Sequence, residues 1–188
     1  MTIWNIARAC KGHLAVPAGK HTGTCPAAGM AVIRGYSGKE AAGIVIDSRK
    51  VEPGDIFVAI RGERVDGHQF IREVFNKGAI AVVCEEEPEE LPGPCIRVED
   101  SLAALRQIAA FYREQMPIPI VGITGSVGKT STKEFVASVL AQKYKTHKTQ
   151  GNFNNEIGVP LTLLAMPEDT EAAVVEMGIN HFGEMHRL

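Results

Sequence analysis

The sequence predicts an α/β protein in which parallel strands alternate with helices. Short apolar runs recur along the chain, segments with apolar residues at helical spacing lie between them, and glycine or proline marks many of the junctions. Such alternation produces a parallel sheet with crossover helices, and its ligands gather at the carboxyl ends of the strands. Because 188 residues exceed the common size of one domain, we expect one large or two small domains.

The composition excludes several classes of protein. Hydrophobic residues make up 45% of the chain and the net charge is −2, so a core can form but a general nucleic-acid binder is not expected. The four cysteines are scattered without a Cys-x-x-Cys pair, which favours reduced thiols over a metal site. No apolar stretch approaches the roughly 18 residues that predict a membrane span, and Arg8 and Lys11 interrupt any signal sequence. We therefore expect a cytoplasmic protein with no membrane insertion.

The first domain is expected to be a small α/β unit. Residues 3–9 predict a short helix, and residues 19–43, rich in glycine and small residues, predict turns around short strands. Further along, the expected strands are 44–46, 56–60, 79–84 and 95–98, and the expected helices cover 70–75 and 102–112. The acidic run 85–90 is interpreted as a solvated loop.

Prolines at 117 and 119 stop the helical pattern and stiffen the joint, so we place a boundary near 115–118. The predicted domains are residues 1–116 and 117–188. The second is the first part of a parallel-sheet domain, with strands at 118–124, 144–148 and 172–177 and helices at 130–143 and 159–164.

One segment predicts a chemistry by itself: residues 122–134, Gly-Ile-Thr-Gly-Ser-Val-Gly-Lys-Thr-Ser-Thr-Lys-Glu, at a strand-to-helix turn. Its glycines let backbone N–H groups approach an anion, its lysine supplies a mobile cation, and Thr130 is placed to bind Mg²⁺. The glycine usually found five residues before Gly128 is replaced by Ile123, but the flanking pattern disfavours an incidental glycine-rich turn. The predicted phosphate contacts are Gly125, Ser126, Val127, Gly128, Lys129, Thr130 and Ser131.

Polar residues follow the next strands at the same predicted edge of the sheet. Glu176 ends an apolar strand, where a carboxylate can hold Mg²⁺ beside Thr130. Asn154 and Asn155 precede a helix; capping accounts for one of them, and the other suits a substrate or the water around a metal. His181, near Glu176, is either an ordinary surface residue or a functional one.

These segments resemble the Mur ligase family of bacterial cell-wall synthesis. The likeness lies in the loop 124–134, in Gly151-Asn152-Phe153-Asn154-Asn155-Glu156 and in Glu176-Met177-Gly178-Ile179-Asn180-His181, and it favours members that add D-alanyl-D-alanine to UDP-N-acetylmuramoyl-tripeptide. The resemblance implies ATP and Mg²⁺ as cofactors, with Lys129, Glu176 and His181 as catalytic residues and Thr130, Glu176 and His181 near the metals. It also implies substrate contacts for Asn154 and Asn155.

The upstream segments 47–49, 57–64 and 66–68 resemble the N-terminal domain of the same ligases. This resemblance implies a UDP-sugar site, with Ile46, Asp47, Ser48 and Arg49 at the uridine end and Glu63 and Arg64 in a second contact segment. An equally acceptable interpretation is that Arg49 pairs with Asp47 or Asp55 and only fixes a turn.

The family's activity implies transfer of the ATP γ-phosphate to the peptide carboxylate, followed by attack of the D-alanyl-D-alanine amine on the acyl phosphate. Family members continue well beyond the region matched here, so this chain is expected to be inactive alone and to self-associate through an incomplete sheet.

Two alternatives remain open, and a third is excluded. The preceding ligase of the pathway, which adds the third amino acid, shares the first domain and the loop but has threonines in place of 154–156. A non-catalytic nucleotide-binding module is the second. A GTPase switch would require an Asn-Lys-x-Asp motif, which the sequence lacks.

Overall fold

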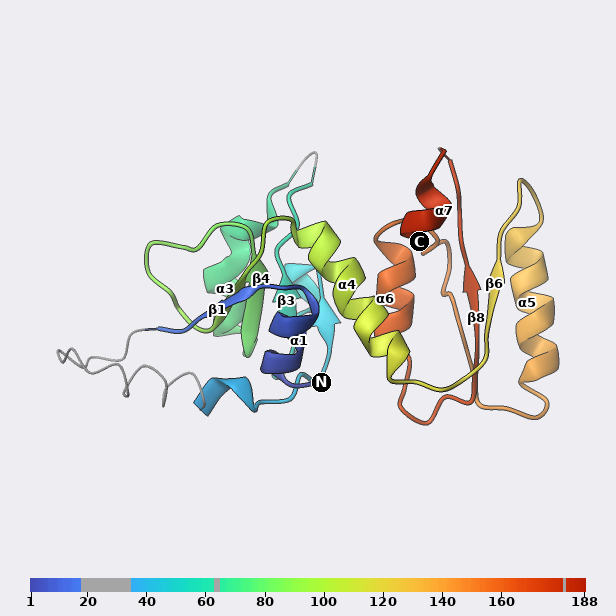
Figure 1. Cartoon of the computed structure of the whole chain (residues 1–188), viewed down its shortest axis with the longest axis horizontal. Coiled ribbons are helices and arrows are strands. Elements are labelled where there is room, and N and C mark those ends of the chain that lie inside the picture. The colour runs from blue at the N-terminus through green and yellow to red at the C-terminus, as the bar shows by residue number, and fades with distance from the viewer. Residues whose placement is uncertain (18–34, 63–64, 181) are drawn as a thin grey trace. The chain divides into compact units, whose positions relative to one another are not determined.

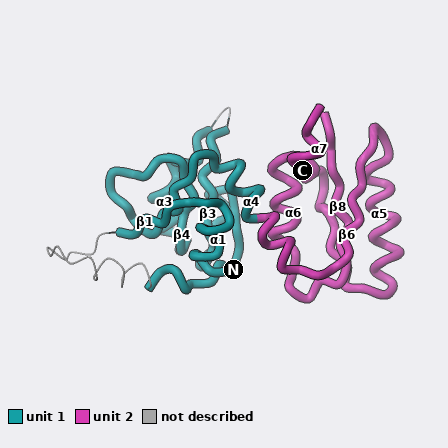
Figure 2. Tube along the Cα trace, in the orientation of Figure 1, with its two compact units in different colours: residues 1–108 teal, residues 109–188 magenta. Residues whose placement is uncertain are grey.

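The computed structural model describes residues 1–17, 35–62, 65–180 and 182–188, which form two compact units, residues 1–108 and 109–188 (Figure 2). The division falls within helix α4 (Ser101–Glu114), a little before the boundary near 115–118 that the prolines suggest. The two units are described separately below.

Unit 1 is built on a five-stranded sheet with the order β1-β5-β4-β3-β2 (Figure 1). Strands β2 to β5 are parallel, and β1 pairs with β5 in the antiparallel direction. The strands are β1 (His13–Ala15), β2 (Ile44–Val45), β3 (Ile56–Val58), β4 (Ala81–Cys84) and β5 (Cys95–Arg97). The helices are α1 (Ile3–Ala9), η1 (Ser48–Lys50), η2 (Gly67–Phe70) and α3 (Ile71–Asn76), followed by the first part of α4.

The core of unit 1 forms where α3 covers the parallel strands. Phe57 and Val82, paired in register, are fully buried and pack with Val74 of α3. Helix α3 ends before Gly78, whose φ of 100° is a left-handed conformation that favours glycine. The predicted helix at 3–9 is confirmed, with the Thr2 side chain accepting a hydrogen bond from the Asn5 N–H at its start.

One part of the first domain differs from the prediction, and another lies mostly outside the described residues. Strand β1 was not predicted, because its three residues carry no strand pattern and it exists through pairing with β5. The turns and strands expected at 19–43 lie mostly outside the described residues; at its described end, residues 35–37 are helical.

Unit 2 contains a three-stranded parallel sheet with the order β6-β8-β7. Its elements are β6 (Ile120–Ile123), α5 (Lys129–Leu140), β7 (Thr146–Lys148), α6 (Gly158–Leu164), β8 (Ala172–Glu176) and α7 (Glu184–Arg187). Helices α5 and α6 lie on opposite sides of the sheet in Figure 1, and all five residues of the central strand β8 are buried. The predicted alternation of strands and helices is therefore confirmed.

Within unit 2 the smaller apolar core lies beneath α6. Met116, Met166 and Ala173 form its centre, and the Tyr112 hydroxyl donates a hydrogen bond of 2.7 Å to the Met166 carbonyl. Across the described ranges of both units, the helices fall short of the length and apolar character that crossing a membrane requires.

Candidate phosphate-binding site

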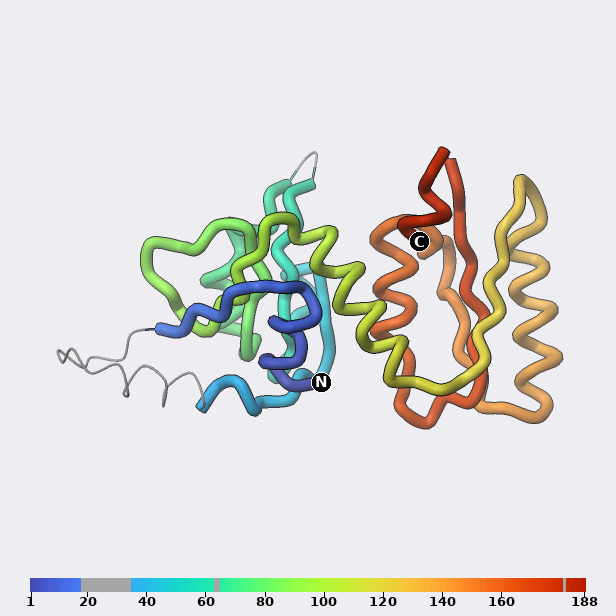
Figure 3. The backbone as a smooth tube through the Cα atoms, in the orientation of Figure 1, coloured from blue at the N-terminus to red at the C-terminus, as the bar shows by residue number. Residues whose placement is uncertain are grey.

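The phosphate loop connects β6 to α5. Figure 3 follows the chain along β6, around the loop and back along α5. Gly125 and Gly128 have φ values of 144° and 74°, which residues with a Cβ rarely adopt. Gly128 is the N-cap of the 12-residue α5, so the unpaired N–H groups of the helix lie beside the loop. Ser126, Val127 and Ser131 are exposed, as a surface that receives an anion requires.

The lysine of the loop folds back over it. Lys129 is the first residue of α5, and its Nζ donates a hydrogen bond of 2.8 Å to the Gly125 carbonyl. The ammonium group therefore lies across the same turn whose backbone would contact phosphate. A single rotatable side chain can carry that charge from the carbonyl to a phosphate oxygen.

Glu176 occupies the carboxyl end of β8, in register with Ile123 at the end of β6. Its carboxylate is almost fully buried, with 2% of the residue exposed. Oε2 accepts a hydrogen bond from the Thr130 hydroxyl at 3.1 Å, and Oε1 accepts one from Asn154 Nδ2 at 2.9 Å. The structure thus brings together three residues that the sequence placed in one site, from three separate segments.

The chemistry of these groups suits a hard cation such as Mg²⁺. The Thr130 hydroxyl directs its proton toward Glu176, so its oxygen lone pairs remain available as ligands. In the part of the chain that is described, no group of three or more His, Cys, Asp or Glu side chains could hold a metal by itself. Mg²⁺ commonly takes few protein ligands and completes its coordination with phosphate oxygens and water.

The second asparagine of the predicted pair has a capping role. Asn155 Oδ1 accepts hydrogen bonds from the N–H groups of Ile157 and Gly158, at 3.2 and 2.8 Å, at the start of α6. Of the two interpretations for these asparagines, capping thus applies to Asn155, while Asn154 faces Glu176. His181, the third predicted metal residue, lies outside the described residues.

Sequence reasoning missed one member of the cluster, Lys133. The residue is only 1% exposed, and its Nζ lies 3.7 Å from Glu176 Oε2 and donates a 3.3 Å hydrogen bond to the Gly151 carbonyl. Lysine is seldom fully buried, so the residue type does not predict a buried position. The available signal is the spacing, because Lys133 follows Thr130 by three residues and both therefore lie on one face of α5. Its neighbour Glu134 pairs with Lys148 and, at 3.4 Å, with Lys133, and these two cations, Lys148 first, lower the pKa of the Glu134 carboxyl.

In unit 1 the predicted uridine segment forms a tight turn after β2. Asp47 caps η1 by accepting the Arg49 N–H, and the Arg49 guanidinium holds the same carboxylate through two hydrogen bonds of 2.9 and 2.8 Å. This pairing keeps the pKa of Asp47 well below its usual value. Arg49 is nevertheless 85% exposed at its side chain, so its outer edge is accessible.

The remaining predicted residues of this segment are placed as follows. Ser48 is buried and its carbonyl accepts a 2.8 Å hydrogen bond from Lys77, and Ile46 directly follows β2. Of the two carboxylates considered as partners for Arg49, Asp47 is the one that binds it, while Asp55 accepts the Glu52 N–H instead. Glu63 and Arg64 lie outside the described residues.

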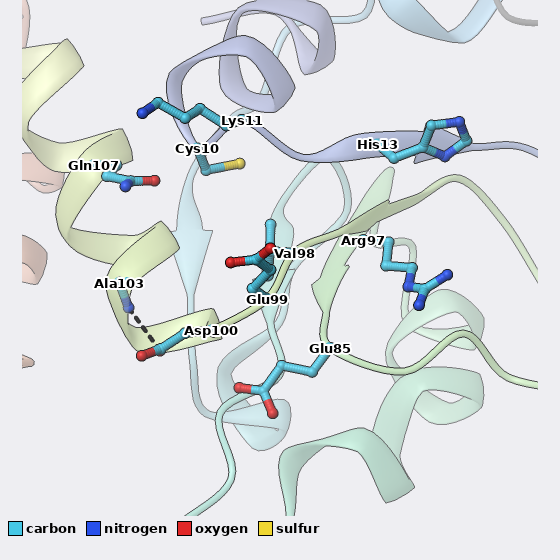
Figure 4. A pocket seen from close by; sticks show the side chains of 10 residues that line it. All are labelled: Cys10, Lys11, His13, Glu85, Arg97, Val98, Glu99, Asp100, Ala103 and Gln107. Atoms are coloured by element: carbon cyan, nitrogen blue, oxygen red, sulfur yellow. Dashed lines mark hydrogen bonds between the residues drawn. The ribbon is translucent and has the colours of Figure 1, made fainter.

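Unit 1 also contains a cavity of about 760 Å³ at the β1–β5 edge of its sheet (Figure 4). Basic and acidic side chains share its lining, among them Lys11, His13, Arg97, Glu85 and Asp100. Asp100 accepts the Ala103 N–H at the start of α4. Among the described residues, none of those predicted for a site lines this cavity, and β2, which precedes the uridine segment, is at the other edge of the sheet.

A glycine loop between a strand and a helix, with a lysine at the helix start and an acid on the neighbouring parallel strand, defines the class of phosphate-loop nucleotide-binding domains. Comparison with models of protein families identifies the family within this class. Residues 40–113 match the model of the "Mur ligase family, catalytic domain", and residues 123–188 match that of the "Mur ligase middle domain". The chain belongs to the Mur ligase family.

Individual relatives agree with this assignment. The UDP-N-acetylmuramoyl-tripeptide–D-alanyl-D-alanine ligase of Bacillus subtilis is 42% identical over 100% of this chain and 38% of its own length. A crystal structure of MurF from Acinetobacter baumannii is 34% identical with a TM-score of 0.81, over 99% of this chain and 37% of that one. MurF ligase from Thermotoga maritima in complex with ADP is 36% identical with a TM-score of 0.72, over 79% and 34% of the two chains. The chain thus spans somewhat over a third of the length of these relatives.

Proposed function

We propose that this chain supplies the UDP-sugar and ATP sites of a cytoplasmic amide ligase that adds D-alanyl-D-alanine to UDP-N-acetylmuramoyl-tripeptide. The observation that carries the proposal is the convergence of Thr130 and Asn154 on buried Glu176 beside the phosphate loop. The proposal draws its substrates from the names of the similar ligases and its chemistry from these residues.

In the proposed reaction, the γ-phosphoryl group of ATP passes to the terminal carboxylate of the peptide, and ADP leaves. The amine of D-alanyl-D-alanine then attacks the acyl carbon, an amide bond forms and inorganic phosphate leaves. Lys129 moves from the Gly125 carbonyl to the phosphate oxygens and stabilises their charge, together with the N–H groups at the start of α5. Mg²⁺, when bound, supplies further neutralisation of that charge, and Thr130 and Glu176 are the residues that would hold it, with His181 proposed near a second metal.

The nucleotide part of the proposal can be tested on the chain itself. Titration calorimetry is expected to detect ADP binding in the presence of Mg²⁺, and Lys129→Ala is expected to weaken it by about a hundredfold, since a charge-assisted contact to phosphate is lost. Lys143→Ala, a change at an exposed lysine beyond α5, is the matched control and should leave binding unchanged. Equal affinities for wild type and Lys129→Ala would contradict the assignment of the phosphate loop.

The substrate part requires two further measurements. UDP-N-acetylmuramoyl-tripeptide is expected to bind the chain, and Arg49→Ala is expected to weaken that binding without changing the affinity for ADP. A chimaera of the Bacillus subtilis relative, with residues 1–188 in place of its matching segment, is expected to release ADP only when both substrates are present. Nucleotide binding without any response to the UDP-sugar would instead favour a non-catalytic nucleotide-binding module.

A further inference from the structure

The buried ammonium group of Lys133 pairs with Glu134 on its own helix, at 3.4 Å, and also contacts two parts of the proposed nucleotide site. It lies 3.7 Å from Glu176 Oε2, at the end of β8, and donates to the Gly151 carbonyl in the turn that follows β7. That turn continues to Asn154, which holds Oε1 of the same carboxylate. One lysine on α5 therefore restrains both the carboxylate and the segment that binds its other oxygen.

The conformation of the turn supports this role. Gly151 has a φ of 53°, in the left-handed region, and its carbonyl accepts the Lys133 hydrogen bond. Asn154 is fixed at its backbone as well, because its carbonyl accepts the Gly178 N–H at 2.7 Å just after β8. The turn thus joins β8 at one end and Lys133 at the other.

Because both side chains are buried, the stability of the fold depends on the charge of Lys133. Glu176 is 2% exposed, and the ion pair with Lys133 is the one the structure gives it within the described ranges. A buried carboxylate deprived of its cation bears the full cost of desolvation, whereas removing both partners is far less costly. A lysine that only filled space in the core would show no such dependence on Glu176.

We propose that Lys133 is a positioning residue, which holds Glu176 and the 151–154 turn in the arrangement that receives the cation and phosphates of a bound nucleotide. This inference rests on the proposed function. Lys133 acts through the geometry of Glu176, while Lys129 acts on the phosphates.

The first test is a double-mutant cycle on the full chain, measured as thermal unfolding without nucleotide. Lys133→Met is expected to lower the melting temperature by about 10 °C because it strands the Glu176 charge. Combining it with Glu176→Gln is expected to restore most of that loss. Additive losses, or a double variant that does not fold, would show that Lys133 serves the general fold, and would overturn the proposal.

The second test measures ADP affinity with and without Mg²⁺ by calorimetry. Lys133→Met is expected to reduce the Mg²⁺-dependent gain in affinity by about tenfold and to leave Mg²⁺-free ADP binding within about twofold. Lys133→Arg, which keeps the charge, is expected to retain most of the gain, and Lys143→Met is the matched control for loss of one positive charge. A larger Mg²⁺ gain in Lys133→Met would mean that the lysine merely competes with the cation, and would also overturn the proposal.

The two tests distinguish failure of the proposed function from failure of the role assigned to Lys133. Failure of the wild-type chain to bind ADP would refute the proposed function, while the unfolding cycle would still decide whether Lys133 and Glu176 are coupled. ADP binding with an intact Mg²⁺ gain in Lys133→Met would refute the role of Lys133 alone.

Discussion

Asp66 shows how a single carboxylate fixes a loop in unit 1. It caps η2 by accepting the His68 N–H at 2.9 Å, and it also accepts His68 Nδ1 at 2.6 Å and Arg61 Nε at 3.1 Å. His68 Nε2 accepts the Glu85 N–H, which requires that the ring proton be on Nδ1, facing Asp66. The two residues therefore connect the segment after β3 to the end of β4.

This arrangement predicts a specific dependence of stability on pH. The hydrogen bonds from the His68 backbone and ring lower the pKa of Asp66 from 3.8 to about 2. Because the folded pKa is lowered, the stabilisation is present above pH 4 and is lost as the pH falls from about 4 to 2. The carboxylate is 40% exposed at its side chain, so solvent screening limits the effect to on the order of 1 kcal/mol.

Asp66→Asn keeps an oxygen that can accept the His68 N–H but removes the titration. Urea unfolding between pH 5 and 2.5 is expected to give a shallower loss of stability for the variant than for wild type, by on the order of 1 kcal/mol across that range. Comparing the slopes cancels the titration of the other carboxylates. Parallel pH profiles would show that Asp66 contributes no such stabilisation.

Among the elements, those with long periodic patterns are the ones that the sequence predicted well. Helix α5 and strand β8 follow 3.6-residue periodicity and a continuous apolar run, and their ends placed Thr130 and Glu176 at one edge of the sheet. Strand β1 and the contacts of Lys133 were missed. Both depend on partners distant in sequence, β5 and Glu176, and neither leaves a local pattern.

The packing of the 151–154 turn against α6 depends on a glycine. A Cβ on Gly158, the first residue of α6, would lie 2.4 Å from the backbone carbon of Phe153, and backbone cannot move aside as a flexible side chain can. The close approach also places Asn155 within reach of the Gly158 N–H. Helix α6 and the turn that carries Asn154 therefore form one packed element.

Gly158→Ala is expected to destabilise the chain by about 1–3 kcal/mol, because the turn must shift away from the helix. Urea unfolding measures the loss, and weaker ADP binding should accompany it, since Asn154 moves with the turn. Gly38→Ala, where an added Cβ meets nothing within 4 Å, is the matched control and should stay within about 0.5 kcal/mol of wild type. Equal stability of the two variants would contradict the packing argument.

At the scale of the whole molecule, the apolar surface of unit 2 bears on association. Phe135 and Val139 are 73% and 72% exposed and lie four residues apart on α5, so they form one stripe. Elsewhere in unit 2, Val121 on the edge strand β6 is 37% exposed. Adjacent exposed apolar side chains such as Phe135 and Val139 mark a contact surface more often than scattered single residues do.

Burying an exposed Phe or Val yields about 1.5–3 kcal/mol, and a symmetric contact between two copies would bury this stripe twice. Association also costs at least about 4 kcal/mol in lost translational and rotational freedom, so we expect a weak dimer that forms at high micromolar concentration.

Sedimentation velocity from about 10 to 500 μM should show the sedimentation coefficient rising with concentration in wild type. The Phe135→Gln/Val139→Gln variant should remain monomeric over that range with unchanged thermal stability, because both side chains are already exposed. Trp4→Gln, which changes a 49% exposed side chain on α1 of unit 1, is the control and should still associate. Loss of association in the control, with retention in the α5 variant, would place the contact on unit 1 and refute the role assigned to the α5 stripe.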